Sequence, residues 1–229
     1  MQQGIMQRPA VPERPRKRRF HPSNLRRAAI GALVALAAVC TGYVWQAQVL
    51  DVNSAKEMRD SGIYAQWAKG GVMVLIRHAE RCDRSHNACL GDPTGITVAG
   101  SQVAVDVGKG IARLGLENAE LLSSPAVRTR QTAYSMFGKP IATQDWLARC
   151  DKGFADVALS HKSAGRNLVL ITHSGCIDQL ERHLNVAGGE RSSAYASALF
   201  IAVADQGNAR VLGQMNASAW NRLGSSAGL

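Results

Sequence analysis

The sequence predicts an α/β domain, a three-layer sandwich in which helices cover both faces of a mostly parallel central sheet. Short strand-forming runs alternate with helical stretches from residue 71 onward, and this alternation is typical of parallel sheets. The first run, residues 71–77, is almost continuously apolar, as expected for a strand that is buried on both faces. Apolar residues make up 46% of the 229-residue chain, which is enough to build such a core.

Local signals define the remaining elements in order. Residues 97–114 are expected to form a helix that begins at Thr97 and ends near Gly115, because a glycine there can adopt the left-handed cap. Pro125 suits the entrance to the next helix. The expected helices are residues 97–114, 127–137, 154–162 and 176–184. The expected strands are residues 71–77, 119–123, 140–143, 167–172, 198–204 and 209–215, with the last two as a hairpin around Gly207.

The net charge of +10 is concentrated at the N-terminus. Eight of the 27 Lys and Arg residues but only one of the 17 acidic residues lie in residues 1–27, so this segment carries +7 and the rest of the chain +3. An uncharged apolar run follows, and a basic flank before such a run stays in the cytoplasm. This topology accounts for the charge, and aromatic residues make up only 5% of the chain, so we expect no nucleic-acid partner.

The uncharged run, residues 28–50, is long enough to span a bilayer, which takes about 20 residues. We interpret it as an uncleaved membrane anchor. A cleaved signal is the alternative, and a buried core helix fits less well because the run has no polar stripe. The predicted organisation is a basic cytoplasmic tail over 1–27, an anchor or signal over 28–50, a linker helix over 51–70 and an exported α/β domain over 71–229.

Export changes how the cysteines are interpreted. Four of the five cysteines follow the apolar run, in a compartment where oxidising conditions favour disulfides. Two disulfides are therefore expected, and four cysteines allow three pairings. No Cys-x-x-Cys or His-x-x-x-His spacing is present, so the sequence does not favour a metal site.

Three polar clusters fall at the carboxyl ends of predicted strands, where open α/β sheets bind their ligands. Arg77 and His78 end the first strand, residues 123–125 end the second with Arg128 in the helix beyond, and His173 ends the fourth. A guanidinium binds phosphate oxygens through two N–H groups and keeps its charge. The clusters therefore predict an anion site, in which an imidazole with one free nitrogen can act as a nucleophile.

These motifs resemble those of the histidine phosphatase superfamily, which has the phosphoglycerate-mutase-like fold. Arg77-His78-Ala79 matches the family's Arg-His-Gly signature with Ala in place of Gly, residues 123–133 (SSPAVRTRQTA) match its Ser-Ser-Pro segment, and His173 in ITHSG matches its second histidine. The resemblance covers about residues 71–185. It implies that His78 attacks phosphorus to form a phosphohistidine, that Arg77, Arg128 and His173 bind the phosphoryl oxygens, and that no cofactor or metal takes part.

The proton donor to the leaving oxygen is where the sequence departs from the family. Ser174 follows the second histidine where one branch has Asp, and residues 147–150 lack the Glu of another branch. The candidates are Glu80, Asp83 and Asp151, and we favour Asp83 because it lies in the loop after the nucleophile.

A closer resemblance lies in residues 77–97 (RHAERCDRSHNACLGDPTGIT), which are similar to the exported lipopolysaccharide core heptose(II)-phosphate phosphatases of bacteria. It implies a periplasmic enzyme, held at the inner membrane by its anchor, with a phosphorylated cell-envelope substrate such as a core heptose phosphate. Arg81 and Arg84 in this loop would contact further acidic groups of that substrate.

The same setting leads us to expect the disulfides Cys82–Cys89 and Cys150–Cys176. The first pair is close in sequence and would hold the loop after the nucleophile. The second would tie a loop beyond the third strand to the start of the helix after His173.

Two alternatives to this function stay open. A phosphatase of lipid-linked polyprenyl phosphates would use the same site and would also suit an anchor. A non-catalytic phosphate-binding module of the envelope would need only the arginines, so the two histidines argue against it. The oligomeric state is not indicated by the sequence.

Overall fold

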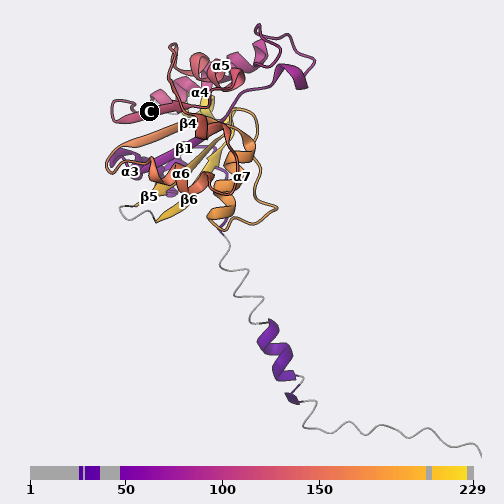
Figure 1. Ribbon diagram of the computed structural model, residues 1–229. Helices are drawn as coiled ribbons and strands as arrows, with labels where there is room; N and C mark the ends of the chain where they lie inside the picture. Colours follow the sequence, from indigo (N-terminus) through magenta and orange to yellow (C-terminus); the bar gives the residue numbers. More distant parts are fainter. Residues whose placement is uncertain (1–25, 28, 37–46, 205–207, 226–229) are drawn as a thin grey trace, which may run out of the picture. The chain divides into compact units, whose positions relative to one another are not determined.

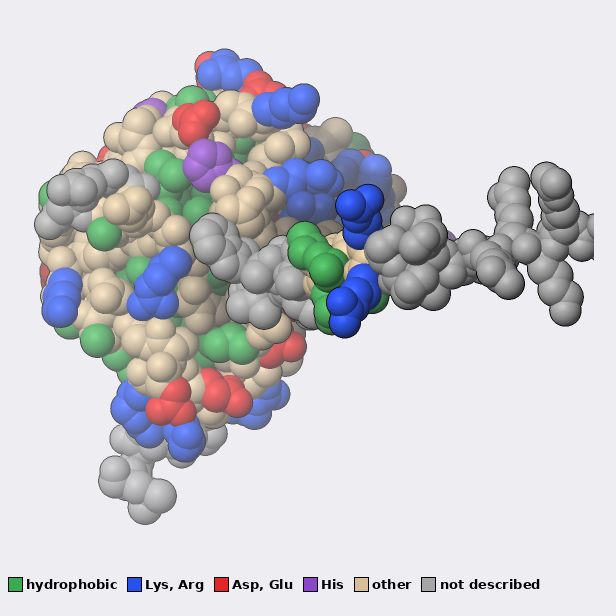
Figure 2. Space-filling view, turned by 90° about the horizontal axis from the view of Figure 1, so that it is seen from below, with side chains coloured by type: hydrophobic (Ala, Val, Ile, Leu, Met, Phe, Trp, Pro, Cys, Tyr) green, Lys and Arg blue, Asp and Glu red, His purple; other side chains and the backbone are tan. Residues whose placement is uncertain are grey.

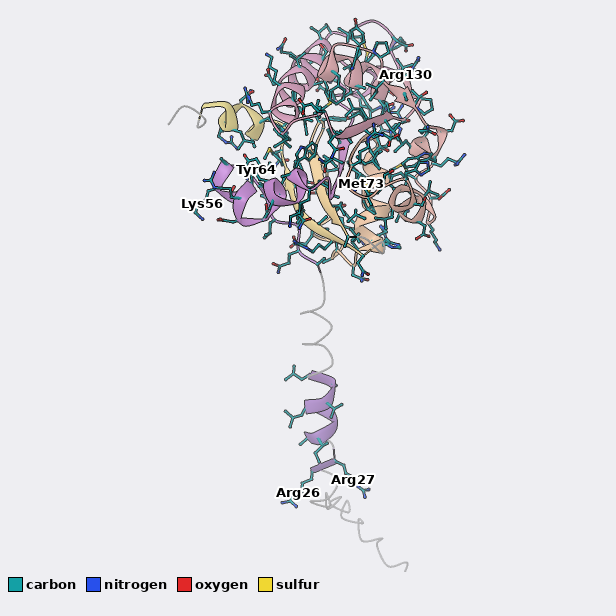
Figure 3. The ribbon with its side chains drawn as sticks, turned by 90° about the vertical axis from the view of Figure 1, so that its left-hand side faces the viewer. Arg26, Arg27, Lys56, Tyr64, Met73 and Arg130 are labelled. Carbon is teal, nitrogen blue, oxygen red and sulfur yellow. A yellow bond between two sulfur atoms is a disulfide. The ribbon has the colours of Figure 1, made fainter. Side chains whose placement is uncertain are left out.

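The computed structural model describes residues 26, 27, 29–36, 47–204 and 208–225, and the chain forms two compact units, residues 1–45 and 46–229. In the first unit, residues 26, 27 and 29–36 are helical, with Arg26 and Arg27 at one end (Figure 3). Residues 1–25 of the expected tail, and residues 28 and 37–46 of the expected anchor, lie outside the described residues. Within the described residues, no helix combines the length and the apolar character that crossing a membrane requires.

The second unit is built on a six-stranded sheet with the strand order β3-β2-β4-β1-β5-β6, of which β4, β1, β5 and β6 are labelled in Figure 1. Four strands pair in parallel, and the last two run antiparallel to their neighbours. The sheet is therefore mixed. The strands are β1 (Val72–Arg77), β2 (Ala119–Ser123), β3 (Ala142–Thr143), β4 (Asn167–Thr172), β5 (Ala198–Val203) and β6 (Ala209–Met215). Residues 205–207, which join β5 to β6, lie outside the described residues.

The helices agree with the sequence prediction in number and order from residue 97 to residue 184. They are α4 (Val98–Ala112), α5 (Val127–Phe137), α6 (Phe154–Ser160) and α7 (Ser174–His183), and the structure adds α8 (Ala219–Ser225) and the 3₁₀ turns η1 (Cys82–Arg84) and η2 (Asp145–Ala148). Thr97 caps α4 as expected, because its hydroxyl accepts a hydrogen bond from the Gly100 N–H at 2.9 Å.

Successive side chains of a strand point to opposite faces, and the central strand β1 therefore divides the core in two. Val74 and Ile76 pack with α2 to α5 and α8 on one face, whereas Met73 and Leu75 pack with η2, α6 and α7 on the other. Met73 lies well inside the domain in Figure 3. All four side chains are fully buried. Helices thus cover both faces of the sheet, and the three-layer arrangement is confirmed.

Residues 51–70 differ from the single linker helix that the sequence suggested. They form two short helices, α2 (Ala55–Asp60) and α3 (Ile63–Ala68), which Gly62 separates with a φ of 81°. Lys56 and Tyr64 mark them in Figure 3. Met58 and Ile63 are fully buried in the first core cluster, so burial of their apolar side chains makes this segment part of the domain.

Charges of both signs lie on the surface of the second unit, and basic side chains neighbour acidic ones at several places in Figure 2. Arg182 and Asp178, for example, form an i,i+4 pair at 2.8 Å on α7. Exposed pairs of this kind contribute about 0–1 kcal/mol. The stability of the domain therefore rests on its two apolar layers.

Candidate active site

The carboxyl ends of β1 and β4 lie side by side at the centre of the sheet, because these strands pair in parallel with Arg77 opposite Thr172. The two histidines that follow the strands are therefore neighbours: the ring centroids of His78 and His173 are 5.5 Å apart. Both residues are buried, with 3% and 9% of their surface exposed. Two of the three predicted clusters thus meet at one point, and the third joins them through β2, which flanks β4.

His78 is held in one tautomer by its own loop. Its Nδ1 lies 2.8 Å from the carbonyl oxygen of Ala79, and because a carbonyl only accepts, Nδ1 carries the proton and Nε2 keeps a free lone pair. Burial lowers the pKa of His78 to about 3, against the opposing effect of the Ala79 carbonyl. The imidazole is therefore neutral at neutral pH, which is the form that a nucleophile needs.

His173 has the opposite tautomer. An Nη2–H of Arg128 donates to its Nδ1 at 3.2 Å, and its Nε2 lies 2.9 Å from the hydroxyl oxygen of Ser124. A guanidinium only donates, so Nδ1 accepts and the proton sits on Nε2. Burial, followed by the charges of Arg128 and Arg81, lowers the pKa of His173 to about 4. The third cluster thus contributes both the hydroxyl and the arginine that orient this histidine.

Arg77 and Arg128 supply the positive charge beside the histidines. Burial is the main cause that lowers the pKa of each guanidinium, although an arginine stays charged in proteins. The Nε atoms of both are buried and have no hydrogen-bond partner within the described part of the chain. A buried donor without a partner costs free energy. The oxygens of a phosphoryl group would satisfy these donors, because they are acceptors that match guanidinium geometry.

Thr132, to which the sequence gave no role, connects the nucleophile loop to the helix of Arg128. Its hydroxyl accepts a hydrogen bond from the Ala79 N–H at 2.9 Å and donates to the carbonyl oxygen of Arg128 at 2.7 Å. The motif contained this residue, but only the contact across 53 positions of sequence shows what it does.

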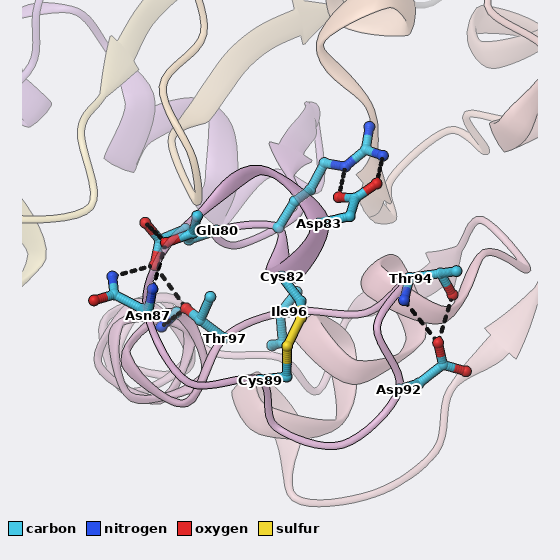
Figure 4. The surroundings of a disulfide bond; sticks show 12 residues. Glu80, Cys82, Asp83, Asn87, Cys89, Asp92, Thr94, Ile96 and Thr97 are labelled. Atoms are coloured by element: carbon cyan, nitrogen blue, oxygen red, sulfur yellow. Dashed lines mark hydrogen bonds and ion pairs between the residues drawn. A yellow bond between two sulfur atoms is a disulfide. The ribbon is translucent and has the colours of Figure 1, made fainter.

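The loop after His78 carries the predicted residues Arg81, Asp83 and Arg84 and is drawn in Figure 4. The Nε of Arg81 donates to Asp83 at 2.7 Å, and a second N–H donates to the other carboxylate oxygen. These bonds hold the pKa of Asp83 below its usual range. Arg84 is exposed, and its charge, like that of Arg81, lowers the pKa of both Arg77 and Arg128. The loop thus adds positive charge to the site.

The acidic candidates for the proton donor are all hydrogen-bond acceptors. Asp83 accepts from Arg81, and Glu80 accepts from Thr97 at 2.7 Å and from Asn87 at 2.9 Å, which lowers the pKa of Glu80 (Figure 4). Asp151 accepts from the Gly153 N–H at 3.0 Å. A general acid needs a pKa near the working pH, so the surroundings of Asp83 and Glu80 do not favour a donor role.

Both expected disulfides are present. Cys82 and Cys89 are joined with Cα atoms 5.2 Å apart, and Cys150 and Cys176 with Cα atoms 4.2 Å apart. The first closes the loop that contains η1, and the second joins the segment after η2 to α7. In the described residues, no three or more His, Cys, Asp or Glu side chains are grouped so as to hold a metal ion.

Sequence similarity to named proteins identifies the class to which this protein belongs. The chain is 35% identical over 156 residues to the lipopolysaccharide core heptose(II)-phosphate phosphatase of Salmonella typhimurium, and equally to that of Salmonella typhi; each match covers 67% of this chain and 75% of the relative. No family model matches the chain. The chain belongs to the histidine phosphatase superfamily and is a phosphatase. Within that superfamily, these relatives are the lipopolysaccharide core heptose(II)-phosphate phosphatases.

Solved structures agree on the fold. The protein histidine phosphatase SixA, complexed with tungstate, aligns with a TM-score of 0.50 and 17% identity, covering 64% of this chain and 97% of that chain. Phosphoserine phosphatase from Entamoeba histolytica, in complex with 3-phosphoglyceric acid, aligns with a TM-score of 0.52 and 14% identity, covering 65% and 98%. At these identities the likeness establishes the fold alone.

Proposed function

We propose that the protein is an exported, membrane-anchored phosphatase that hydrolyses a heptose phosphate of the lipopolysaccharide core through a phosphohistidine on His78. The observation that carries the chemistry is the free Nε2 of His78, which the hydrogen bond from Nδ1 to Ala79 leaves unprotonated beside Arg77, Arg128 and His173. The 35% identity to heptose(II)-phosphate phosphatases supports the substrate.

The reaction has two steps. Nε2 of His78 attacks phosphorus, the bond from phosphorus to the sugar oxygen breaks, and the sugar oxygen leaves with a proton. Water then attacks the phosphohistidine, which releases phosphate and returns the lone pair to Nε2. Arg77, Arg128 and His173 stabilise the charge on the phosphoryl oxygens in both transition states.

Although the pairing with Arg81 lowers the pKa of Asp83, this residue remains our candidate for the proton donor because it lies in the loop after the nucleophile, and the leaving group provides its test. Loss of a general acid costs about 10²- to 10⁴-fold when the leaving oxygen is basic, and much less when it leaves unaided. Asp83→Asn should therefore slow the hydrolysis of an alkyl phosphate such as glycerol 2-phosphate far more than that of p-nitrophenyl phosphate. Glu80→Gln applies the same comparison to the second candidate carboxylate, and an equal loss on both substrates in Asp83→Asn would reject Asp83 as the donor.

Arg81 and Arg84 form a basic rim that suits a substrate with more than one anionic group. Both lie close enough to influence Arg77 and Arg128 electrostatically, and Asp83 compensates only part of their charge. We therefore expect Arg81→Ala plus Arg84→Ala to weaken activity on phosphorylated core oligosaccharide more than on p-nitrophenyl phosphate. Arg113→Ala plus Arg166→Ala, at two exposed positions outside this loop, is the control and should affect neither substrate.

Export is supported by the two disulfides and by the basic flank before the apolar run. A reporter phosphatase that works only outside the cytoplasm should be active when fused after residue 50, and a fluorescent protein that folds only in the cytoplasm should be dark there. The opposite pattern would place the domain inside the cell and exclude an envelope substrate.

The substrate itself is tested by deleting the gene. The heptose assignment predicts that the inner core of the lipopolysaccharide then carries more phosphate, which mass spectrometry of the isolated core oligosaccharide measures. An unchanged phosphate count together with accumulated polyprenyl phosphates would instead identify a phosphatase of lipid carriers.

A further inference from the structure

The segment of residues 193–197, which precedes β5, passes over the catalytic end of β1 and belongs to no motif that the sequence revealed. Its position follows from the antiparallel pairing of β5 with β1, in which Ala198 lies opposite Ile76. The Ala196 N–H lies 3.1 Å from the carbonyl oxygen of Arg77 and 3.3 Å from that of His78. The backbone N–H of Arg77 donates to the carbonyl oxygen of Ser197 at 3.1 Å. Ala196 adopts a left-handed φ of 56°, which is rare for a residue other than glycine.

Two contacts from this segment fix the side chain of Arg77. The Nη1 of Arg77 donates to the carbonyl oxygen of Ser193 at 2.6 Å, and its guanidinium carbon lies 4.0 Å from the centre of the Tyr195 ring. The Tyr195 ring also lies 5.7 Å from the His78 ring, centroid to centroid. One tyrosine therefore contacts both the charged group and the imidazole of the predicted Arg-His pair.

We propose that Tyr195 is a positioning residue for the phosphatase reaction, which sets the plane of the Arg77 guanidinium so that its remaining N–H groups meet the transferring phosphoryl group. The inference rests on the proposed function. A guanidinium stacked on an aromatic face is held electrostatically and loses rotational freedom. The Ser193 carbonyl then occupies one of the five N–H donors of Arg77, and these two contacts together restrict the orientation of the guanidinium.

The contacts of Tyr195 favour this role over a role in core packing. Tyr195 is only half-buried, and it belongs to neither of the two hydrophobic clusters that flank the sheet. Its described ring contacts are with Arg77 and His78. Replacing the ring should therefore alter the site without opening a cavity in either core layer.

Substitution in the full-length chain tests the proposal. Tyr195→Leu should lower kcat/KM for p-nitrophenyl phosphate by about 10- to 30-fold, the range expected for a desolvated cation–π contact, with most of the loss in kcat. Tyr195→Phe keeps the ring but removes the hydroxyl, whose interaction with Arg77 raises the pKa of that guanidinium, so it should cost clearly less than Tyr195→Leu without matching the unmodified protein. Tyr134→Leu, which changes a tyrosine that is 57% exposed on α5, is the matched control and should behave as the unmodified protein. The melting temperature should be the same for all.

A double-mutant cycle separates positioning from an independent effect. If Tyr195 acts through Arg77, Tyr195→Leu should cost little more once Arg77→Lys has removed the planar group, and the two losses should be far from additive. Calorimetric binding of vanadate, an analogue of the phosphoryl group, supplies a second readout that needs no turnover and should give the same pattern.

Two results would overturn the inference: full activity of Tyr195→Leu, or an equal loss from Tyr195→Leu whether or not the chain also carries Arg77→Lys. Failure of the proposed function looks different. In that case His78→Ala would keep its activity, whereas the vanadate cycle would still report whether Tyr195 and Arg77 are coupled.

Discussion

The ends of β1 and β4 and the loop that follows β1 contribute to the same site by different physical means. At the strand ends, His78 and His173 are buried and neutral, and a hydrogen bond fixes the proton of each ring. In the loop, Arg81 and Asp83 are charged, more exposed and paired with each other, and a disulfide holds the backbone. Burial keeps the imidazole of His78 neutral and reactive, whereas the exposed charges of Arg81 and Arg84 would act on further anionic groups of the substrate. Changes at the strand ends should therefore affect every substrate, and changes in the loop only some.

The largest expected effect is at the nucleophile. His78→Ala should abolish the hydrolysis of p-nitrophenyl phosphate, because no other group in the described part of the site supplies a free imidazole nitrogen. Brief mixing of the unmodified protein with labelled substrate, followed by an alkaline quench, should trap an acid-labile and base-stable phosphoprotein. Near-normal turnover by the Ala variant would show that the buried pair does not perform the chemistry.

The second effect concerns the charge beside the histidines. Arg128→Ala should lower kcat by about 10²- to 10³-fold, the scale of losing one preorganised donor to a developing charge. It also removes the hydrogen bond to Nδ1 of His173. The loss should be the same for a phosphorylated core oligosaccharide and for p-nitrophenyl phosphate. A loss confined to the oligosaccharide would show that Arg128, like the loop, recognises the substrate and does not stabilise the transferring phosphoryl group.

The neutral state of His78 should appear in the pH dependence of stability. Its pKa is about 3 in the folded protein and 6.5 ordinarily, so between these values only the unfolded chain binds the proton. The free energy of unfolding should then fall as the pH is lowered from 6.5, by about 1.4 kcal/mol per pH unit for one such group.

Glu181 changes the free energy of unfolding with pH in the opposite direction, so the measurement must remove its contribution. Burial raises its pKa to about 7 from the ordinary 4.5, so its contribution to stability is present below pH 4.5 and is lost as the pH rises towards 7. In urea unfolding of His78→Gln and of the unmodified protein at about pH 7, 6 and 5, Glu181 contributes equally to both proteins and cancels in the difference between them. The two stability curves should converge or cross as the pH falls, and parallel curves would contradict a depressed pKa at His78.

The smallest effect on catalysis is expected from loss of the disulfide that closes the loop. Replacing Cys82 and Cys89 with Ser should lower the free energy of unfolding by about 2–3 kcal/mol on a chain-entropy estimate, and replacing Cys150 and Cys176, which close a longer loop, by about 3–4 kcal/mol. Turnover of p-nitrophenyl phosphate by the Cys82/Cys89 variant should stay close to normal at a temperature where it is folded. Loss of that activity would mean that the loop and the strand ends do not act separately.

The sequence was sufficient wherever a residue's position depends on its own strand or helix. Residues 119–123, 127–137, 167–172 and 209–215 form the elements expected of them without a shift in either end, and each predicted histidine lies directly after a buried strand. The positions of such residues can be predicted because the burial patterns and short motifs that determine them lie within one stretch of chain.

Residues whose role depends on a distant partner could not be predicted. Tyr195 contacts Arg77 only because β5 lies antiparallel beside β1, and no local pattern encodes that neighbour. The burial of Met58 depends in the same way on packing against the sheet. The ionisation of Asp83 is set by its pairing with Arg81, which the sequence places nearby but does not orient.

The hydroxyl of Thr132 has a consequence for motion in the site. It is bonded on one side to the backbone just after His78 and on the other to the backbone of Arg128. Because Thr132 and Arg128 both belong to α5, a movement of α5 relative to β1 would stretch the bond to Ala79, and this bond therefore ties the nucleophile loop to the helix that carries Arg128. We expect Thr132→Val, which replaces the hydroxyl with a methyl group, to remove both hydrogen bonds and so to let the nucleophile loop and α5 move independently.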